Sequence, residues 1–140
     1  MSKVAVVYWS GTGNTKIMAE EVAKGAEAAG AEVTVLTPSK FNADMVDQFD
    51  GIGFGCSSMG VEVLEESEFE PMFEACEAKL KGKKIALFGS YGWGDGEWMR
   101  SWEERCRMDG ANLATDYVIA NEEPDEQAKE ECQALGRALA

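Results

Sequence analysis

The sequence predicts an α/β fold in which a doubly wound, five-stranded parallel sheet carries helices on both faces. Short apolar, β-rich runs alternate with segments of helical periodicity along all 140 residues. The first of these runs ends in a glycine-rich loop that opens directly into a helical segment. The chain shows no internal repeat, linker or low-complexity segment, and its apolar fraction of 45% is ordinary. We therefore expect one domain over residues 1–140.

The predicted elements follow one another in regular alternation. Strands are expected at Lys3–Tyr8, Glu32–Thr37, Gly51–Cys56, Lys84–Ser90 and Ala114–Ala120. Helices are predicted by apolar residues at helical spacing: Met18, Val22, Ala26 and Ala29; Phe69, Phe73, Cys76 and Leu80; Met99, Trp102 and Cys106; Ala128, Cys132, Leu135 and Leu139. A shorter helix is expected over Asn42–Gln48. Because crossovers between parallel strands are right-handed, the pattern favours strand order 2-1-3-4-5.

The composition restricts the classes of function. Thirteen Lys and Arg stand against 26 Asp and Glu, which gives a net charge of -13. Such a surface repels nucleic acid and anionic membranes and favours partners with basic patches, although acidity that serves only solubility is the alternative. With no histidine and four widely spaced cysteines, neither a metal site nor a catalytic base is expected. No signal-peptide pattern or long apolar stretch is seen, so we expect a cytoplasmic protein with reduced thiols.

The first loop has the chemistry of an anion cradle. Glycines allow its backbone N–H groups to approach a ligand closely, and the following helix N-terminus favours negative charge. Hydroxyl and amide side chains add donors, and no Lys or Arg lies inside the loop. The alternative is an ordinary strand–helix turn in which a Thr or Asn caps the helix. The loop comprises Trp9, Ser10, Gly11, Thr12, Gly13, Asn14 and Thr15.

Two further loops are expected beside the first, because ligands bind beyond the carboxyl ends of the strands where the strand order reverses. One follows the third strand and carries Ser57, Ser58, Met59, Gly60, Val61 and Glu62. The other follows the fourth strand and carries Ser90, Tyr91, Gly92, Trp93, Gly94, Asp95 and Gly96. Glycines flank Trp93 on both sides, which suggests an aromatic ring displayed to cover a planar ligand.

Four segments of the chain resemble the short-chain flavodoxins of clostridial type. They are YWSGTGNT at 8–15, GCSSMG at 55–60, LEESEFEP at 64–71 and FGSYGWGDGEWM at 88–99. The resemblance implies a flavodoxin-like fold, and flavodoxins are themselves a type example of the 2-1-3-4-5 order. It also implies non-covalently bound FMN and a low-potential one-electron carrier, shuttling between semiquinone and hydroquinone, rather than an enzyme.

The resemblance also implies roles for individual residues. Ser10, Thr12, Gly13, Asn14 and Thr15 would bind the phosphate, with Ser57 closing its far side. Trp93 and Met59 would lie against the two faces of the flavin ring, and Glu62 would accept a hydrogen bond from its pyrimidine end. Gly89 to Gly96 would supply backbone contacts, and the Gly60 peptide would flip on reduction. Val61 departs from the usual pattern, and its β-branched side chain resists the positive φ of some turns.

The implied partners are reductases and oxidoreductases with basic patches, of the kind that ferredoxin also serves. We expect a monomer that meets them through acidic residues around the flavin edge. The candidates are Glu62, Glu65, Glu66, Asp95 and Glu97. Charge-steered encounter of this kind is sensitive to salt.

Other phosphate-binding proteins fit the sequence less well. The first loop has no Lys at the position that ATP- and GTP-binding loops require, and Glu62 stands where a phosphatase built on Cys56 would need Arg. Two alternatives stay open: a flavin-dependent NAD(P)H:quinone reductase that uses the same cradle, and a binding module without a cofactor.

Overall fold

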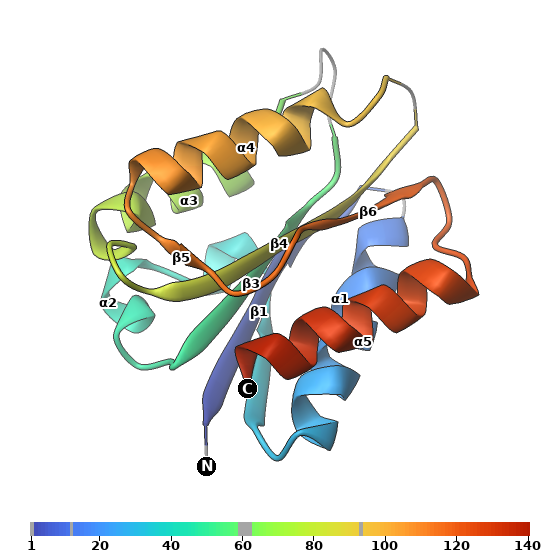
Figure 1. Cartoon of the computed structure of the whole chain (residues 1–140). Coiled ribbons are helices and arrows are strands. Elements are labelled where there is room, and N and C mark those ends of the chain that lie inside the picture. Colours follow the sequence, from blue (N-terminus) through green and yellow to red (C-terminus); the bar gives the residue numbers. More distant parts are fainter. Residues whose placement is uncertain (1, 12, 59–62, 93) are drawn as a thin grey trace.

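A parallel sheet forms the centre of the molecule, in the order β2-β1-β3-β4-β5 (Figure 1). The computed structural model describes residues 2–11, 13–58, 63–92 and 94–140. The strands are β1 (Lys3–Trp9), β2 (Glu32–Leu36), β3 (Gly51–Cys56), β4 (Lys84–Tyr91), β5 (Asn112–Leu113) and β6 (Val118–Asn121). The predicted fold class and strand order are therefore confirmed. All strand pairs are parallel, so the carboxyl ends gather at one edge of the sheet.

The last predicted strand, Ala114–Ala120, is wrong as one continuous element. Only the end of this range is a strand, as part of β6, and β5 lies just before the range. β5 and β6 pair with the beginning and the end of β4 on the same side. Four residues, 114–117, lie opposite only two residues of β4, 86–87, so the segment between β5 and β6 bulges out of the strand pairing. Such extra residues are typical of an edge strand, which has no second neighbour to hold it in register. Alternation of side chains in the sequence could not reveal this change of register.

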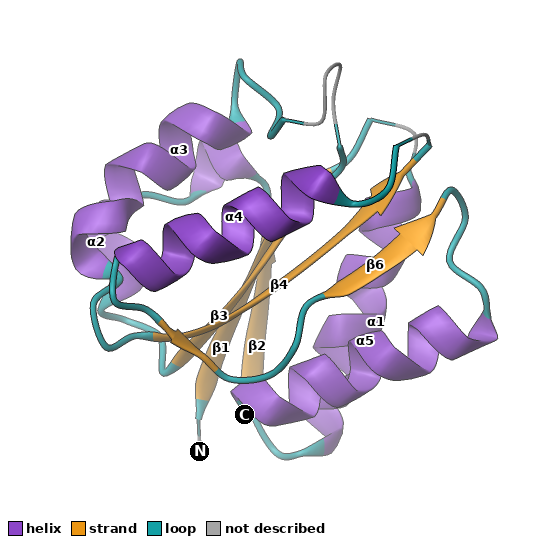
Figure 2. Cartoon of the chain, turned by 45° about the horizontal axis from the view of Figure 1, so that its top comes forward, coloured by secondary structure: helices purple, strands orange, loops and turns teal. Residues whose placement is uncertain are grey.

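The helices form two layers, one on each face of the sheet (Figures 1 and 2). One face is covered by α1 (Asn14–Ala28) and α5 (Glu126–Leu139). The other is covered by α3 (Phe69–Cys76), α4 (Glu97–Met108) and the short α2 (Ala43–Val46). Two 3-10 turns complete the set, η1 (Pro38–Lys40) and η2 (Glu77–Lys79). Within the described residues, no helix is both long and apolar enough to cross a bilayer.

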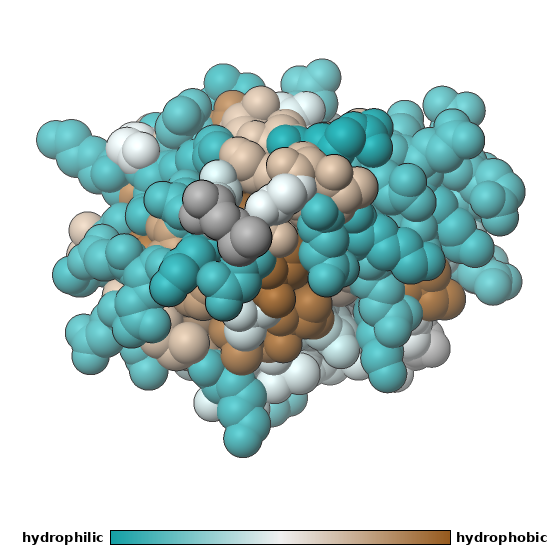
Figure 3. Space-filling view, turned by 90° about the horizontal axis from the view of Figure 1, so that it is seen from below, coloured by the Kyte–Doolittle hydropathy of each residue, from teal (hydrophilic) through white to brown (hydrophobic). Residues whose placement is uncertain are grey.

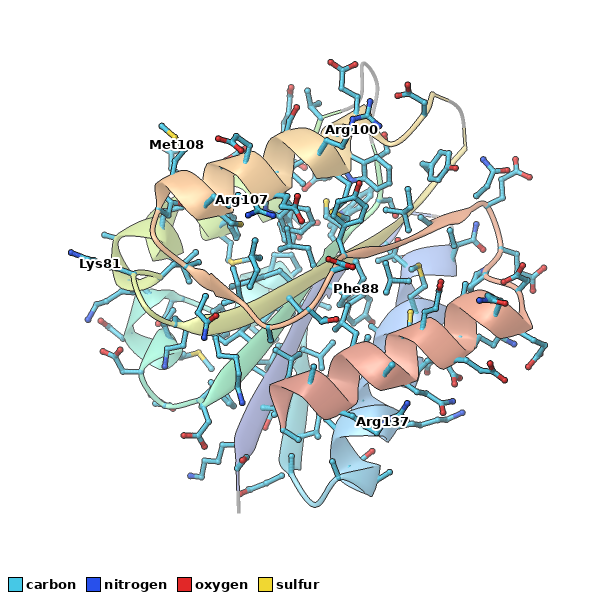
Figure 4. The ribbon with its side chains drawn as sticks, in the orientation of Figure 1. Lys81, Phe88, Arg100, Arg107, Met108 and Arg137 are labelled. Atoms are coloured by element: carbon cyan, nitrogen blue, oxygen red, sulfur yellow. The ribbon has the colours of Figure 1, made fainter. Side chains whose placement is uncertain are left out.

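The close contact between α1 and α5 depends on glycines. A Cβ added to Gly136 would lie 2.0 Å from the Val22 carbonyl oxygen, and one added to Gly25 would lie 1.9 Å from the Gln133 carbonyl oxygen. Both distances are far inside van der Waals contact with backbone atoms, which cannot rotate away. The glycines thus let the two helices share one apolar layer, into which the fully buried Phe88 side chain of β4 also packs (Figure 4).

On the other face, an ion-pair network joins α4 to α3 and η2. The Arg105 guanidinium donates two hydrogen bonds of 2.7 Å to the Glu70 carboxylate, and its Nε donates to Glu77 at 2.9 Å. It also lies 5.0 Å from the centre of the Phe73 ring, which is a favourable cation–π distance. This network secures α4, whose first turn continues from the loop after β4.

The end of the molecule opposite the carboxyl edge carries both chain termini (Figure 1). Seen from that end, the surface is largely hydrophilic, with a hydrophobic area near its middle and smaller ones toward its edges (Figure 3). Among described residues, the large hydrophobic side chains that remain exposed are Val35, Val63 and Met108. Val35 lies in β2, Val63 in the loop after β3 and Met108 at the end of α4. Because the three side chains belong to different elements, they are scattered single residues of the surface.

Candidate functional site

A cavity of about 230 Å³ lies at the carboxyl edge of the sheet, where the sequence predicted a ligand. It is bordered by the loops that follow β1, β3 and β4, as expected, and also by the loop that follows β6. The described residues that line it are Trp9, Gly11, Asn14, Ser57, Ser58, Ser90, Tyr91, Gly92 and Glu122. Their polar groups are hydroxyls, amides and backbone, and Glu122 alone among them carries a charge.

Helix α1 begins at this cavity without a side-chain cap. Its N-cap is Gly13, in the left-handed conformation with φ 97°, which a side chain would make costly. The Gly13 N–H donates to Ser10 Oγ at 3.0 Å, which closes the loop onto itself. By contrast, side chains of Asn42 and Asp125 cap α2 and α5. The alternative of a turn in which Thr or Asn caps the helix is therefore wrong. The N–H groups of the first turn of α1 are left for a ligand.

Hydroxyl groups tie the neighbouring loops together behind this helix start. Thr15 is fully buried, and its Oγ1 lies 2.7 Å from Ser57 Oγ and accepts a 3.2 Å hydrogen bond from the Ser90 N–H. The Ser58 N–H donates in turn to the Ser90 carbonyl at 3.0 Å. The first turn of α1, the loop after β3 and the end of β4 thus form one hydrogen-bonded unit.

Glu122 is a residue of this cavity that the sequence reasoning missed. Its carbonyl accepts a 2.8 Å hydrogen bond from Ser90 Oγ, and its N–H donates to the Tyr91 carbonyl at 2.7 Å. It has φ 59°, the one positive φ among the described non-glycine residues, and such backbone often occurs at functional sites. The signal that could have identified it is its position directly after the last strand, because every carboxyl end of the sheet meets at this edge.

The Trp9 side chain lines the cavity and contacts two neighbouring segments. A Cβ added to Gly11 would lie only 3.0 Å from the Trp9 ring, so the loop passes close over the indole. The indole Nε1–H donates to Glu68 Oε2 at 3.2 Å. Trp9 therefore links the first loop to the segment that precedes α3.

Several predicted site residues lie outside the described residues. They are Thr12, Met59, Gly60, Val61, Glu62 and Trp93, so the stacking of Trp93 and the peptide flip at Gly60 stay predictions. Gly94 and Gly96 both have positive φ, and Gly96 begins α4 without a side-chain cap. Gly89 lies within β4, where an added Cβ would meet the Cys56 carbonyl oxygen at 2.2 Å. A glycine is thus required at position 89 because β4 packs closely against the end of β3 there.

The acidic rim differs from the expected docking surface at two positions. Glu65 is wrong as a surface charge: it is 6% exposed, and its carboxylate accepts hydrogen bonds from the N–H groups of Ser67, Glu68 and Phe69 at 2.7–2.9 Å. Although burial raises the pKa of Glu65, hydrogen bonds led by that from the Ser67 hydroxyl outweigh this effect and hold it below the ordinary value.

Asp95 is exposed, but its charge is partly neutralised by Arg100 at 3.0 Å. Figure 4 shows Arg100 near the first turn of α4, at the end of that helix nearest the site. Glu66 stays an exposed acid of the expected rim. The charge that faces a partner is therefore less than a count of acidic residues suggests.

Neither thiol chemistry nor a metal is supported at the described positions. Burial raises the pKa of Cys56 to about 12, so its thiol stays protonated and unreactive at neutral pH. No group of three or more Cys, Asp or Glu is arranged to hold a metal ion within the described residues. The site can instead bind an anion through neutral donors and a helix N-terminus, which is the donor set that a terminal phosphate requires.

The chain is similar to known proteins over almost its whole length. The family model described as "Flavodoxin" matches residues 6–136. The flavodoxin of Clostridium beijerinckii is 50% identical over 96% of this chain and 97% of its own length. The flavodoxin of Megasphaera elsdenii is 48% identical over 98% of both chains. The solution structure of two-electron reduced Megasphaera elsdenii flavodoxin superposes with a TM-score of 0.90, covering 97% of each chain.

Proposed function

The chain belongs to the flavodoxin family, and from this premise we propose that it carries single electrons at low potential, with FMN cycling between its two reduced states. Flavodoxins are electron-transfer flavoproteins rather than enzymes, and FMN is their cofactor. The observation that carries the proposal is the uncapped start of α1, which opens into a cavity closed by three further strand ends.

The residues at this helix start fit the phosphate of FMN. The first-turn N–H groups of α1 would donate to the phosphate oxygens, and the hydroxyl of Ser57 would donate from the opposite wall. The flavin supplies the redox chemistry when bound, while this chain binds, orients and partly shields it. Tyr91 and Gly92 continue the cavity wall from the phosphate end toward the loop that carries Trp93.

Negative charge around the site supports a low potential. A reduced flavin tends to be anionic, and it would share this region with the Glu122 carboxylate in a protein of net charge -13. Each 1.4 kcal/mol by which the surroundings disfavour the added charge lowers a one-electron potential by about 60 mV. The protein would thereby favour giving an electron to a partner rather than keeping it.

The same charge suggests how partners are recognised. Redox proteins with basic patches would be steered toward the acidic molecule and would dock at the rim of the cavity, where Glu66 is exposed. We propose that the protein acts as a cytoplasmic monomer in this exchange. Its encounter rate with a basic reductase should fall as salt is added, because exposed charges are screened within about 8 Å at physiological ionic strength.

The cofactor assignment is tested by comparing FMN with riboflavin, which lacks the phosphate. Loss of several hydrogen bonds to a charged group, at roughly 1.5–3 kcal/mol each, should weaken binding of riboflavin to the apoprotein by orders of magnitude. Equal dissociation constants would contradict a phosphate cradle. Stepwise reduction of the FMN-loaded protein then measures both potentials, and rapid oxidation of NADPH without a partner reductase would favour a quinone reductase instead.

A further inference from the structure

A second cavity, of about 210 Å³, opens between α3 and α4, which lie side by side on one face of the sheet (Figure 2). We call it the α3–α4 cavity. Its inner side is apolar, because one leucine and two tryptophans that line it are buried, whereas Val63 is exposed at its rim. None of its lining residues belongs to the first cavity. The described residues that line it are Val63, Leu64, Glu70, Trp98, Ser101, Trp102 and Arg105.

Trp98 lies between the α3–α4 cavity and the flavin site. Its indole N–H donates to the Cys56 carbonyl at 3.3 Å, at the end of β3. Its ring centre lies 5.5 Å from that of Tyr91, which lines the first cavity. Val63 and Leu64 belong to the loop that leaves the same strand end. A group bound in the α3–α4 cavity would therefore lie beside the flavin site without entering it, which suits an electron-transfer partner.

Exposed carboxylates flank the α3–α4 cavity on both sides. Glu66 lies in the turn before α3, Glu74 on α3 and Glu104 on α4. Glu74 follows the lining residue Glu70 by four positions, and Glu104 follows the lining residue Ser101 by three, so each shares a helix face with the cavity. We call Glu66, Glu74 and Glu104 the flanking acids. They form no ion pair with any residue that the structure describes.

The cations nearby do not neutralise the flanking acids. Among the described lining residues, Arg105 alone is cationic, and its guanidinium is bound by the carboxylates of Glu70 at 2.7 Å and Glu77 at 2.9 Å. These three side chains together carry a net negative charge. The other cations of α4, Arg100 and Arg107, form ion pairs with further acids. The apolar cavity thus opens between two acidic edges.

We propose that the α3–α4 cavity is a docking site for a redox partner, which inserts one apolar side chain and places flanking Lys or Arg residues against the flanking acids. The proposal rests on the electron-carrier function proposed above and specifies the chemistry of the partner. Protein interfaces commonly combine a buried apolar anchor with a polar rim. A second copy of this chain is disfavoured as the occupant, because it would bring its own net charge of -13 to the same acids.

A peptide titration of the FMN-loaded protein tests this chemistry. The probe is a short peptide, blocked at both ends, with one leucine between two pairs of lysines, and its control has serine in place of leucine. Both peptides carry the same charge, so the ratio of their dissociation constants isolates the apolar anchor. Binding is followed by two-dimensional proton–nitrogen NMR, in which the amides of Val63 and Ser101 should shift most. We expect the leucine peptide to bind about tenfold more tightly, the equivalent of about 1.4 kcal/mol.

Variants separate the anchor from the charge. Ser101→Phe should fill the cavity and reduce the ratio to about twofold or less, whereas Ser101→Ala should retain it. Val63→Ser, which removes apolar surface at the rim, replaces Ser101→Phe if that variant does not fold. Glu104→Gln should weaken both peptides by the same factor, about two- to fivefold at low salt. Glu27→Gln makes the same charge change at an exposed position of α1, on the other face of the sheet, and should have less effect.

Three results would overturn the proposal: equal binding of the two peptides, no binding of either, or shifts confined to another surface. Sedimentation equilibrium tests the other occupant, because a dimer that Ser101→Phe dissociates would identify a second copy of this chain and overturn the partner assignment. A purified protein that binds no FMN would refute the proposed function instead, and the two peptides would still report on the cavity.

Discussion

Replacing Glu65 with Ala should destabilise the protein by about 3 kcal/mol, an effect unusual for an acidic residue. Its carboxylate accepts hydrogen bonds from three successive backbone N–H groups, of Ser67, Glu68 and Phe69, at the start of α3. The N–H groups of Glu68, the N-cap, and of Phe69, the first residue of α3, are donors that a helix N-terminus leaves without partners, and the Ser67 N–H belongs to the turn before the helix. Leaving one buried N–H unsatisfied costs about 1–3 kcal/mol, and caps alone contribute up to about 2 kcal/mol. Because such losses are not additive, about 3 kcal/mol is the expected total.

The neighbouring Glu66 provides a matched control. It carries the same charge one residue away but is exposed, so Glu66→Ala should change the free energy of unfolding by less than about 0.5 kcal/mol. Urea unfolding of both apoproteins at pH 7, followed by far-UV circular dichroism, measures the difference. If Glu65→Ala and Glu66→Ala unfolded at the same urea concentration, the carboxylate would not be the cap of α3.

The low pKa of Glu65 adds a pH dependence of known sign. Since the folded-state pKa lies below the ordinary glutamate value, the ionised carboxylate stabilises the fold above about pH 4. This contribution is lost as the pH falls through the folded-state pKa. Glu65→Gln should therefore be less stable than the unmodified protein at pH 7, and the gap should narrow in more acidic solution. A constant gap would contradict this reasoning.

Three further predictions concern other parts of the molecule. Gly136→Ala should destabilise the protein by about 1–3 kcal/mol in urea unfolding, because the new Cβ would meet the Val22 carbonyl oxygen. Gly92→Ala should leave the unfolding midpoint unchanged, because no atom lies within 4 Å of a Cβ at that position. Burial and the nearby Glu77 raise the pKa of Asp109 to about 6. The unfolded chain therefore loses this proton at lower pH than the folded protein, and the free energy of unfolding should fall by about 1 kcal/mol, allowing for solvent screening, as the pH rises from 4 to 7. Asp109→Asn should remove that fall in urea unfolding measured across this pH range. Glu122→Gln should raise the potential of the lower-potential couple by about 20–40 mV in a redox titration, and an unchanged value would exclude Glu122 as an electrostatic influence.

The order and type of the main elements could be predicted from the sequence, because hydrophobic periodicity is a local property. The first four strands agree with the predicted ranges to within one residue at either end. The meeting of three loops at the carboxyl edge also followed from sequence, since parallel strands joined by helices leave those loops no other place. The phosphate-binding hypothesis depended on the loop after the first strand. Its glycines and hydroxyl residues stand together in eight consecutive residues, 8–15, so the sequence alone shows them.

Tertiary structure alone decided which polar residues face inward. Glu65 and Glu66 are identical and adjacent, yet one is buried as a helix cap and the other is exposed. Thr15 is hidden behind Ser57, and Glu122 reaches the cavity from a loop more than 100 residues away from the first one. The split between β5 and β6 likewise depends on register against β4. The hydrogen bonds of Glu65 are local, to residues 67–69, but the composition of the segment does not tell which of two adjacent acids makes them. In the other cases the deciding contact joins segments distant in sequence, and a pattern along the chain does not show which distant group a residue will meet.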